Sequence, residues 1–538
     1  MVPTSMWPQT YDPVAGSLGI SALVAALPIF VLLVLLGVLR KPAWIASLCG
    51  LAAAVIVAAT VYHMPGSMIV SSTLYGAANG LLPIGWIVFT AILLYRLTIE
   101  TGKFEIIKDS IGSLTGDQRV LALLIAFAFG AFIEGAAGFG TPVAVAAAML
   151  TGLGFSPFYA AGICLLANTS PVAFGSIGTP LVMLQTVTRL PMTALSSNVG
   201  RICAPVSLFV PAYLMLVMGG VKALRAVAPA AAICGIAFAG AQFYTSNFVG
   251  PYLTDILGSL AAIGALIVLL RFWKPADAVA AKPHRHTQGS VFMAWIPYVF
   301  LVILVLLWGL DSVKAILNRA TFVFFWPGLH NLVQRMPPIT PVPSPYAASY
   351  TLNLLSASGT SCLFAVILSA IALRVPPGKL ARCTWITMRQ LALPLLTIAT
   401  VVGLAFLMNY SGATATLGLA FAATGSAFPF FSALLGWLGV FLTGSDTSAN
   451  ALFGTLQVVT ANKLALNPAL MAAANSSGGV MGKMISLTSV AVAAAATGMA
   501  RDEEGRLFRF TLGHSIFMAA VIGLITMFYA YVMPGWVK

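Results

Sequence analysis

Two acidic residues far apart in the chain lie in Gly/Ser-rich interruptions of otherwise apolar segments. Glu134 lies in FGAFIEGAAGFGTPVAVA, and Asp446 lies in GVFLTGSDTSANALFG. A second interrupted apolar segment follows each of them, CLLANTSPVAFGSIGTP at Asn168 and AAANSSGGVMGKMIS at Asn475. Acidic and amide groups are costly at membrane depth, and interrupted helices at that depth form solute and ion sites. The repeated pattern therefore predicts a site where a polar solute and a coupling ion cross a bilayer.

The two carboxyls admit two interpretations. Glu134 and Asp446 would each cap a nearby helix N-terminus, where backbone N–H groups hold an anion. Alternatively, desolvation favours the neutral acid, so that at least one of them exchanges a proton during transport. We favour the second interpretation, because each carboxyl lies where the other half's interruption should converge. Most other acidic residues lie in polar loops, and Asp255 is near enough to a span end to reach the membrane interface.

The two later interruptions have a mechanical explanation. Proline lacks an amide proton and glycine weakens a helix, so the chain opens and leaves N–H groups of the next half-helix unpaired. Two opposed half-helix N-termini would hold a small carboxylate at the midplane. The residues expected to bind it are Asn168, Thr169 and Ser170 in the first break, and Asn475, Ser476, Ser477 and Gly478 in the second. The alternative is a Pro/Gly kink that serves only helix packing.

Lys483 is the only basic residue that we place deep in the membrane. If its span ends early, the side chain extends to the interface. An unpaired ammonium at that depth is expensive, so we expect it to pair with a carboxyl or to bind the substrate anion.

Composition sets the class of protein. Of 538 residues, 60% are hydrophobic and 7% are charged, against roughly a quarter charged in an average soluble domain. The net charge of +14 comes from short loops, where it orients helices, so we expect no nucleic-acid partner. The six cysteines and five histidines lack ligand spacing, which predicts neither a metal nor a cofactor. The N-terminal segment lacks the basic region of a cleavable signal peptide.

Apolar runs predict twelve crossings. They cover residues 17–39, 43–62, 81–99, 157–185, 200–218, 224–246, 251–271, 291–308, 350–373, 385–408, 468–499 and 510–533. An external N-terminus puts most of the 27 Lys and Arg residues on the cytoplasmic side. Segments 120–155 and 427–465 have limbs too short to span, so we expect re-entrant hairpins.

The predicted fold is an all-α polytopic membrane protein with inverted-topology repeats, two re-entrant hairpins and two broken helices. Repeat one covers residues 1–218, with hairpin 120–155 and broken helix 157–185. Repeat two covers 291–538, with hairpin 427–465 and broken helix 468–499. Residues 219–290 supply two connecting helices and a basic cytoplasmic linker. Such repeats are typical of alternating-access transporters, although accidental similarity between segments is the alternative.

The interrupted segments resemble those of the bacterial L-lactate permease family. The resemblance rests on GAFIEGAAGFGTPVAVAAAMLTGLGF, LLANTSPVAFGSIGTP, GVFLTGSDTSANALFG and AANSSGGVMGKMISLTSVAVA, and it is weakest in the loop 309–350. It implies proton symport of 2-hydroxymonocarboxylates, namely L-lactate, D-lactate or glycolate, in the cytoplasmic membrane. By analogy with a related transporter superfamily, it also implies an elevator mechanism.

The expected function is proton-coupled symport of these substrates, with a sodium-coupled carboxylate transporter as the alternative. Thr141 and Thr447 are candidates to bind the 2-hydroxyl, Glu134 or Asp446 carries the proton, and Lys483 balances charge. An intramembrane protease would need a catalytic pair, and a receptor would need a soluble domain, so we expect no enzyme. The expected partners are the carboxylate, the proton and membrane lipids, and a homodimer would supply a broad scaffold. The residues do not determine which 2-hydroxy acid is preferred.

Overall fold

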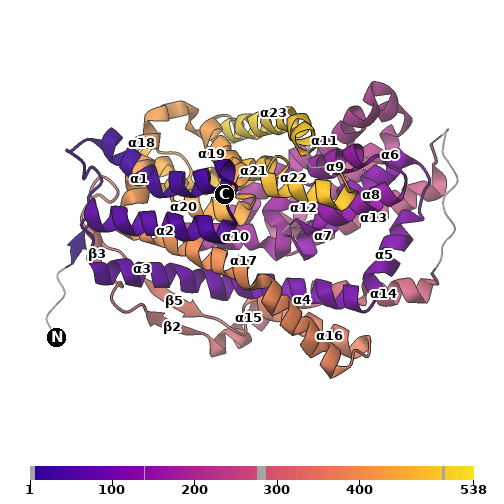
Figure 1. Cartoon of the computed structure of the whole chain (residues 1–538), viewed down its shortest axis with the longest axis horizontal. Coiled ribbons are helices and arrows are strands. Elements are labelled where there is room, and N and C mark those ends of the chain that lie inside the picture. Colours follow the sequence, from indigo (N-terminus) through magenta and orange to yellow (C-terminus); the bar gives the residue numbers. More distant parts are fainter. Residues whose placement is uncertain (1–5, 139, 276–285, 500–502) are drawn as a thin grey trace.

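The computed structural model describes all residues except 1–5, 139, 276–285 and 500–502. It is mostly helical, and most helices run along the long axis of the molecule (Figure 1). Much of the predicted basic linker and the first five residues of the N-terminal segment lie outside the described residues. Within the described part, twelve helices are long and apolar enough to cross a membrane, and a bent pair would make a thirteenth. The chain is therefore polytopic, as predicted.

The helices of the first third surround the first interruption. They are α1 (Leu18–Leu33), η1 (Val34–Val38), α2 (Ala43–Thr60), α3 (Gly66–Asn79), η2 (Gly80–Gly85), α4 (Trp86–Glu100), α5 (Lys103–Gly112), α6 (Gln118–Leu121), η3 (Ala122–Phe129), α7 (Gly130–Ala136), α8 (Thr141–Gly152), α9 (Pro157–Ala167), η4 (Val172–Phe174) and α10 (Gly175–Thr188).

The middle of the chain forms long helices and a small β-structure. Its elements are α11 (Met192–Ala226), α12 (Ala228–Phe248), α13 (Thr254–Phe272), α14 (Gln288–Gly309), α15 (Asp311–Leu317), η5 (Asn318–Ala320), β2 (Phe322–Phe325), β3 (Val333–Arg335), β4 (Ser344–Pro345), β5 (Ser349–Leu352) and α16 (Ser358–Ala372).

The last third surrounds the second interruption. Its elements are α17 (Pro377–Ser411), α18 (Ala413–Phe421), η6 (Ala422–Ala427), α19 (Phe428–Thr443), α20 (Asp446–Lys463), α21 (Pro468–Lys483), α22 (Leu487–Thr497), α23 (Glu504–Tyr531) and η8 (Pro534–Trp536).

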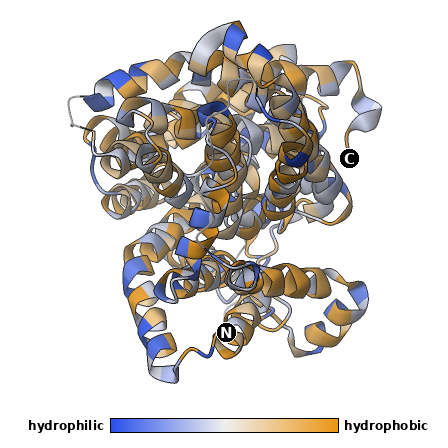
Figure 2. Ribbon diagram, turned by 90° about the vertical axis from the view of Figure 1, so that its right-hand side faces the viewer, coloured by the Kyte–Doolittle hydropathy of each residue, from blue (hydrophilic) through white to orange (hydrophobic). Residues whose placement is uncertain are grey.

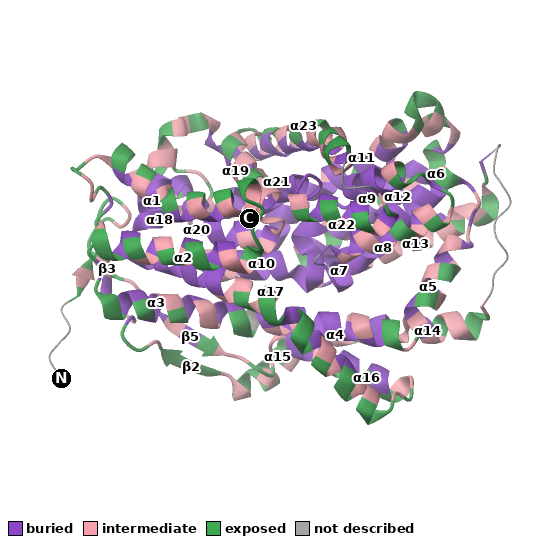
Figure 3. Ribbon diagram, viewed as in Figure 1, coloured by how far each residue is buried: buried purple, intermediate pink, exposed green. Residues whose placement is uncertain are grey.

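Buried and exposed surfaces are arranged as a bilayer requires. Hydrophobic residues dominate the helices and charged residues gather towards their ends and loops (Figure 2). Large apolar side chains such as Leu23, Ile56 and Phe209 point outward, whereas buried residues concentrate along the central helices (Figure 3). In a lipid environment, outward apolar side chains need no further explanation. Of the six cysteines, five are buried and Cys49 is exposed.

Two predicted spans have the wrong limits. The span 81–99 begins earlier, because α3, η2 and α4 form one helix from Gly66 to Glu100. The prediction missed its N-terminal half because the polar residues there lower the hydropathy. In the fold these polar groups are hydrogen-bonded within the protein: Ser71 Oγ donates to Pro327 O at 2.6 Å, and Asn79 Nδ2 donates to Tyr75 O at 2.8 Å. Hydropathy alone does not detect such a helix.

The predicted span 350–373 is only partly helical. Its first residues form β5, which pairs antiparallel with β2, and α16 then has 15 residues. At 1.5 Å per residue this helix is about 22 Å long, short of the roughly 30 Å hydrocarbon core. Tyr350 and Thr351, which the prediction counted in the span, are an aromatic and a β-branched residue and therefore good strand formers.

The loop region that precedes α16 covers one end of the helices. β1 (Trp7–Pro8) pairs in parallel with β3, and β3 pairs antiparallel with β4. This region is tied to α3, since Trp326 Nε1 donates to Ser71 O at 3.1 Å and Tyr75 Oη donates to Ser349 O at 2.7 Å. β3 and β4 lie in the loop 309–350, where the family resemblance is weakest.

The first limb of the segment 120–155 is longer than predicted. Residues Gln118–Ala136 form one helical stretch of 19 residues, and nearly all of it is buried in protein. Such enclosure explains why its polar tip is tolerated at depth. The limb's length alone therefore does not distinguish a re-entrant hairpin from a crossing, and the hairpins stay a prediction.

Candidate functional site

The first predicted helix break is confirmed. α9 ends at Ala167, Asn168 is its C-cap, and α9 and the helix from Val172 to Thr188 are bent by 65°. A second irregularity follows, because Ser176 and Ile177 have φ angles of 46° and 56°. Left-handed backbone is unfavourable for such residues, and for β-branched Ile177 in particular, and it persists where surrounding packing imposes it. Packing in the protein core therefore holds the backbone in this broken conformation.

Glu134 lies directly against this break. The carboxyl is 4% exposed, and Asn168 Nδ2 donates to its Oε2 at 3.1 Å. The chain makes room for it at Gly175, where a Cβ atom would lie 2.6 Å from Oε1 of Glu134. The structure therefore brings together two of the predicted site residues, one from α7 and one from the break.

Asp446 begins the second helix of the other interruption. Gly444 has a left-handed φ of 73°, and the N-cap is Ser445, whose Oγ accepts from Ser448 N at 3.3 Å. The Asp446 carboxyl, 3% exposed, instead accepts at Oδ2 from Ser476 Oγ at 2.6 Å. Its hydrogen bonds are to side chains, so the N-cap interpretation of this carboxyl is wrong.

A chain of amides extends from Asp446 into the core. Asn450 Nδ2 donates to Ser476 Oγ and to Pro180 O, both at 3.1 Å. Asn475 Nδ2 donates to Asn450 Oδ1 at 2.9 Å, and Gln457 Nε2 donates to Asn475 Oδ1 at 3.0 Å. Asn450 and Gln457 were missed from the sequence. Their spacing of four and eleven residues from Asp446 would have placed all three on one helix face.

The second predicted break is in the wrong place. Residues 475–479 are helical within α21, and the chain leaves the helix only at Met484 before Ser486 caps α22. The glycines serve packing, because a Cβ atom on Gly478 would lie 2.0 Å from Ala433 O of α19. Asn475, Ser476, Ser477 and Gly478 therefore form no half-helix N-terminus, and the packing alternative holds for this segment.

Lys483 is buried at the end of α21. Its ammonium is not at the interface: the side chain is 8% exposed and Nζ donates to Gly444 O at 2.8 Å. It also interacts electrostatically with both Glu134 and Asp446. Lys483 therefore binds the end of α19 while it acts on both carboxyls. The interfacial alternative is wrong.

The remaining predicted residues differ in how free their side chains are. Thr169 Oγ1 donates to Leu166 O at 2.7 Å, whereas Ser170 Oγ and Ser477 Oγ are buried with no hydrogen-bond partner among the described residues. Thr141 is the first residue of α8 and Thr447 the second of α20, and both are half-buried. No described contact joins either threonine to the carboxyls.

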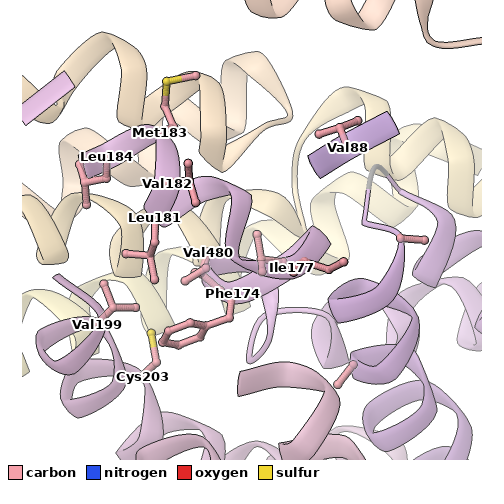
Figure 4. Close-up of a cluster of buried hydrophobic side chains, with 14 of the residues drawn as sticks. Val88, Phe174, Ile177, Leu181, Val182, Met183, Leu184, Val199, Cys203 and Val480 are labelled. Carbon is pink, nitrogen blue, oxygen red and sulfur yellow. The ribbon is translucent and has the colours of Figure 1, made fainter. Parts of the chain in front are cut away.

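The two networks meet around one apolar cluster. Phe174, Leu181, Val199, Cys203 and Val480 pack together from η4, α10, α11 and α21 (Figure 4). Glu134 and Asp446 interact electrostatically across this region. The Asn450 bond to Pro180 fixes α20 against the kinked α10. The four positions that the sequence predicts to converge therefore lie in one core region and do not face lipid.

A large cavity opens near the end of α10. It has a volume of about 830 Å³, and its lining carries Arg189, Lys314, Asn79 and Gln185 but no acidic residue. A second cavity of about 620 Å³ is lined by Glu105, Lys108 and Asp109. Glu134 and Asp446 line neither of these two cavities. Among the described residues, the polar core is therefore separate from these two cavities.

Asp255 does not lie at the membrane interface. It is the second residue of α13 and is 1% exposed, packed against Gly135 next to Glu134. It does lie near the end of its span, but the preceding loop folds inward against α10, where Pro251 contacts Gly178. A hydropathy profile does not show that a neighbouring helix buries a residue.

Comparison with known proteins gives one consistent result. The family model described as L-lactate permease matches residues 21–533. The chain is 44% identical to the L-lactate permease of Bacillus subtilis, over 97% of this chain and 98% of that one. It is 43% identical to the glycolate permease GlcA of Escherichia coli, over 98% and 99%. The solved YdaH transporter of Alcanivorax borkumensis aligns over 86% of this chain and 88% of its own, at 17% identity and a TM-score of 0.45.

Proposed function

The chain belongs to the L-lactate permease family, and on that premise we propose that it carries L-lactate and related small 2-hydroxymonocarboxylates, D-lactate and glycolate among them, in symport with protons. A permease moves its substrate across a membrane, so the chain is a transporter and not an enzyme. With its apolar helices, it is a multi-pass protein of the cytoplasmic membrane.

One observation carries the mechanism: the hydrogen bond from Asn168 to Glu134 joins a buried carboxyl to a helix break. A group that binds at the break competes for the Asn168 amide, so it changes the environment of the carboxyl. In this proposal the substrate carboxylate binds at Asn168, Thr169 and Ser170, and Glu134 or Asp446 carries the proton. Such linkage of an anion site to a proton site is what symport requires.

The second half contributes side chains from a continuous helix. Asn475, Ser476, Ser477 and Gly478 face α19 and α20, and we assign them to substrate binding through the network around Asp446. Thr141 and Thr447, at the starts of α8 and α20, are the proposed ligands of the 2-hydroxyl. Lys483 balances the charge of the carboxyls and the substrate.

The proposed architecture is an inverted repeat that works as an elevator. α7 and α8 with α9 and α10 would correspond to α19 and α20 with α21 and α22, within repeats 1–218 and 291–538 joined by residues 219–290. The labels α8 and α20 lie at opposite ends of the long axis in Figure 1, which supports re-entrant hairpins inserted from opposite faces. The hairpins and broken helices would then move against a scaffold, which a homodimer would broaden.

Proteoliposomes test the coupling directly. Labelled lactate is offered under an inward proton gradient to the wild type and to a Glu134→Gln, Asp446→Asn double variant. We expect accumulation in the wild type and none in the variant. A Glu105→Gln, Asp109→Asn variant is the matched control, because both of these carboxyls are exposed.

Two outcomes would contradict the proposal. If lactate still accumulates in the double variant, neither Glu134 nor Asp446 is needed to carry the proton. If wild-type uptake follows a sodium gradient at fixed pH, the sodium-coupled alternative holds. Counterflow against a panel of unlabelled carboxylates identifies the preferred 2-hydroxy acid.

A further inference from the structure

Asp255 is a buried carboxyl with no hydrogen-bond partner among the described residues. It is 1% exposed, and both Oδ1 and Oδ2 lack such a partner. An ionised carboxylate in this position would be strongly desolvated, and no side chain offsets that cost; only the N-terminal dipole of α13 favours the charge. A buried carboxyl in a membrane protein usually has a functional role, and the residues around Asp255 indicate which role.

Glu134 is a titratable neighbour of Asp255. α13 packs on α7, and a Cβ atom on Gly135 would lie 2.8 Å from the Cβ of Asp255. Glu134, the residue before that glycine, interacts electrostatically with Asp255. From α11, the Cys203 thiol also interacts with it. The described residues of η3, α10 and α12 that pack on α13 include no charged side chain.

Charge balance points in the same direction. The fully buried charged side chains described in the structure are Glu134, Asp255 and Asp446, with Asp117 in an ion pair to Arg119, and Lys483 as the one ammonium. Three buried carboxylates and an incoming substrate anion exceed what a single ammonium neutralises. Two neighbouring buried carboxyls do not both ionise, and they titrate as a pair.

We propose that Asp255 and Glu134 form a carboxyl pair that binds the transported proton between them, beneath the first helix break. The inference rests on the proposed proton symport and deepens it by naming where the proton is held. Asp446 differs, because Ser476 donates to it and Asn450 lies 3.4 Å from it. The Asp446 network is therefore assigned to the substrate, and the Asp255–Glu134 pair to the proton.

The chain segment that leads into α13 connects this pair to the wall of the large cavity, although neither carboxyl lines that cavity. Tyr252 and Leu253 line the 830 Å³ cavity, and Asp255 follows two residues later. On the other side, Asn168 connects Glu134 to the break. A proton that enters through the cavity would reach Asp255 first and Glu134 next. Substrate bound at Asn168 would then sense whether Glu134 is protonated.

The test separates driven accumulation from exchange in proteoliposomes. We compare Asp255→Asn with the wild type under an inward proton gradient, and in counterflow at equal pH on both sides. We expect accumulation to fall at least about tenfold and exchange to fall less than about threefold, because only the proton site is altered. Asp255→Glu should restore accumulation in part, and the exposed Asp311→Asn is the matched control.

A double variant sharpens the result. If Asp255 and Glu134 hold one proton, Asp255→Asn combined with Glu134→Gln should lose no more accumulation than the more severe single variant. If the losses of accumulation in the two single variants add in the double variant, Asp255 and Glu134 do not share one proton. Equal losses of accumulation and exchange in Asp255→Asn, or unchanged proton-driven accumulation, overturn the role of Asp255. If lactate accumulation by the wild type does not depend on the proton gradient, the proposed proton symport itself is wrong.

Discussion

The side-chain amide of Asn450 donates to the carbonyl of Pro180 at 3.1 Å, across 270 positions of sequence. This bond ties α20, which begins with Asp446, to α10, which begins beside the Glu134 carboxyl. Proline at position 180 leaves the carbonyl of an earlier residue without its helical donor, and the surrounding kink exposes carbonyls to side-chain donors. The Asn450 amide therefore helps to fix the two halves of the polar core to each other, together with the bond from Thr455 Oγ1 in α20 to Val187 O in α10 at 3.0 Å.

Replacement of Asn450 by alanine should loosen this connection. The variant leaves Pro180 O, Asn475 Nδ2 and Ser476 Oγ with fewer partners in the core. We expect a loss of about 1–3 kcal/mol of stability, measured as a lower melting temperature in detergent, together with reduced lactate uptake. Asn462→Ala, on the exposed face of the same helix, is the control. Equal melting temperatures for the two variants would show that the amide is dispensable.

Loss of the Ser476 hydroxyl should weaken transport more than it weakens the fold. Ser476 Oγ donates to Asp446 Oδ2 at 2.6 Å, a bond to an acidic group. Since such bonds contribute about 1.5–3 kcal/mol, Ser476→Ala should reduce uptake by at least about tenfold. Initial rates of labelled lactate uptake check this. Ser448→Ala, half-buried in α20, should keep near wild-type rates; an equal decline in both variants would remove Ser476 from the site.

Because α21 packs closely against α19, there is no room for a side chain at position 478. A Cβ atom there would lie 2.0 Å from Ala433 O, a backbone atom that does not move away easily. Gly478→Ala should therefore cost at least about 1–3 kcal/mol, seen as a lower melting temperature and lower yield. Gly513→Ala in α23, where nothing lies within 4 Å, should be neutral or slightly stabilising. A stable Gly478→Ala protein would contradict the packing explanation.

The basic lining of the large cavity should guide the substrate anion. Arg189 Nη2 donates to Tyr75 Oη at 2.6 Å and presents its charge to a cavity without acidic lining residues. Arg189→Gln should raise the KM for lactate about three- to tenfold with kcat little changed, and added salt should reduce the difference. Kinetics at low and high ionic strength measure both effects. Arg189→Lys should keep the low KM, and an equally raised KM in that variant would assign Arg189 to packing instead.

The sequence by itself determined the class of the molecule and part of its site. Apolar runs predicted a polytopic membrane protein, because bilayer thickness fixes the length of a spanning helix. Pro171 and Asn168 predicted the first break, since a proline cannot continue a helical hydrogen-bond ladder. Glu134 and Asp446 were found from the sequence because a carboxyl within an apolar segment is costly in a membrane, and this contrast is visible within the segment itself. The family motifs then indicated a lactate permease.

Tertiary structure decided the rest, because it depends on partners remote in sequence. Gly478 and Gly479 read locally as a helix break, but the backbone of α19 beside them makes them packing residues in an unbroken helix. Asp255 reads as interfacial, but the loop before it folds inward and buries it beside Glu134. The spacing of Asn450 and Gln457 places them on one helix face with Asp446, but only the fold brings Asn475 opposite them. Sequence determines the preferences of each segment, whereas only packing decides which neighbour satisfies each polar group.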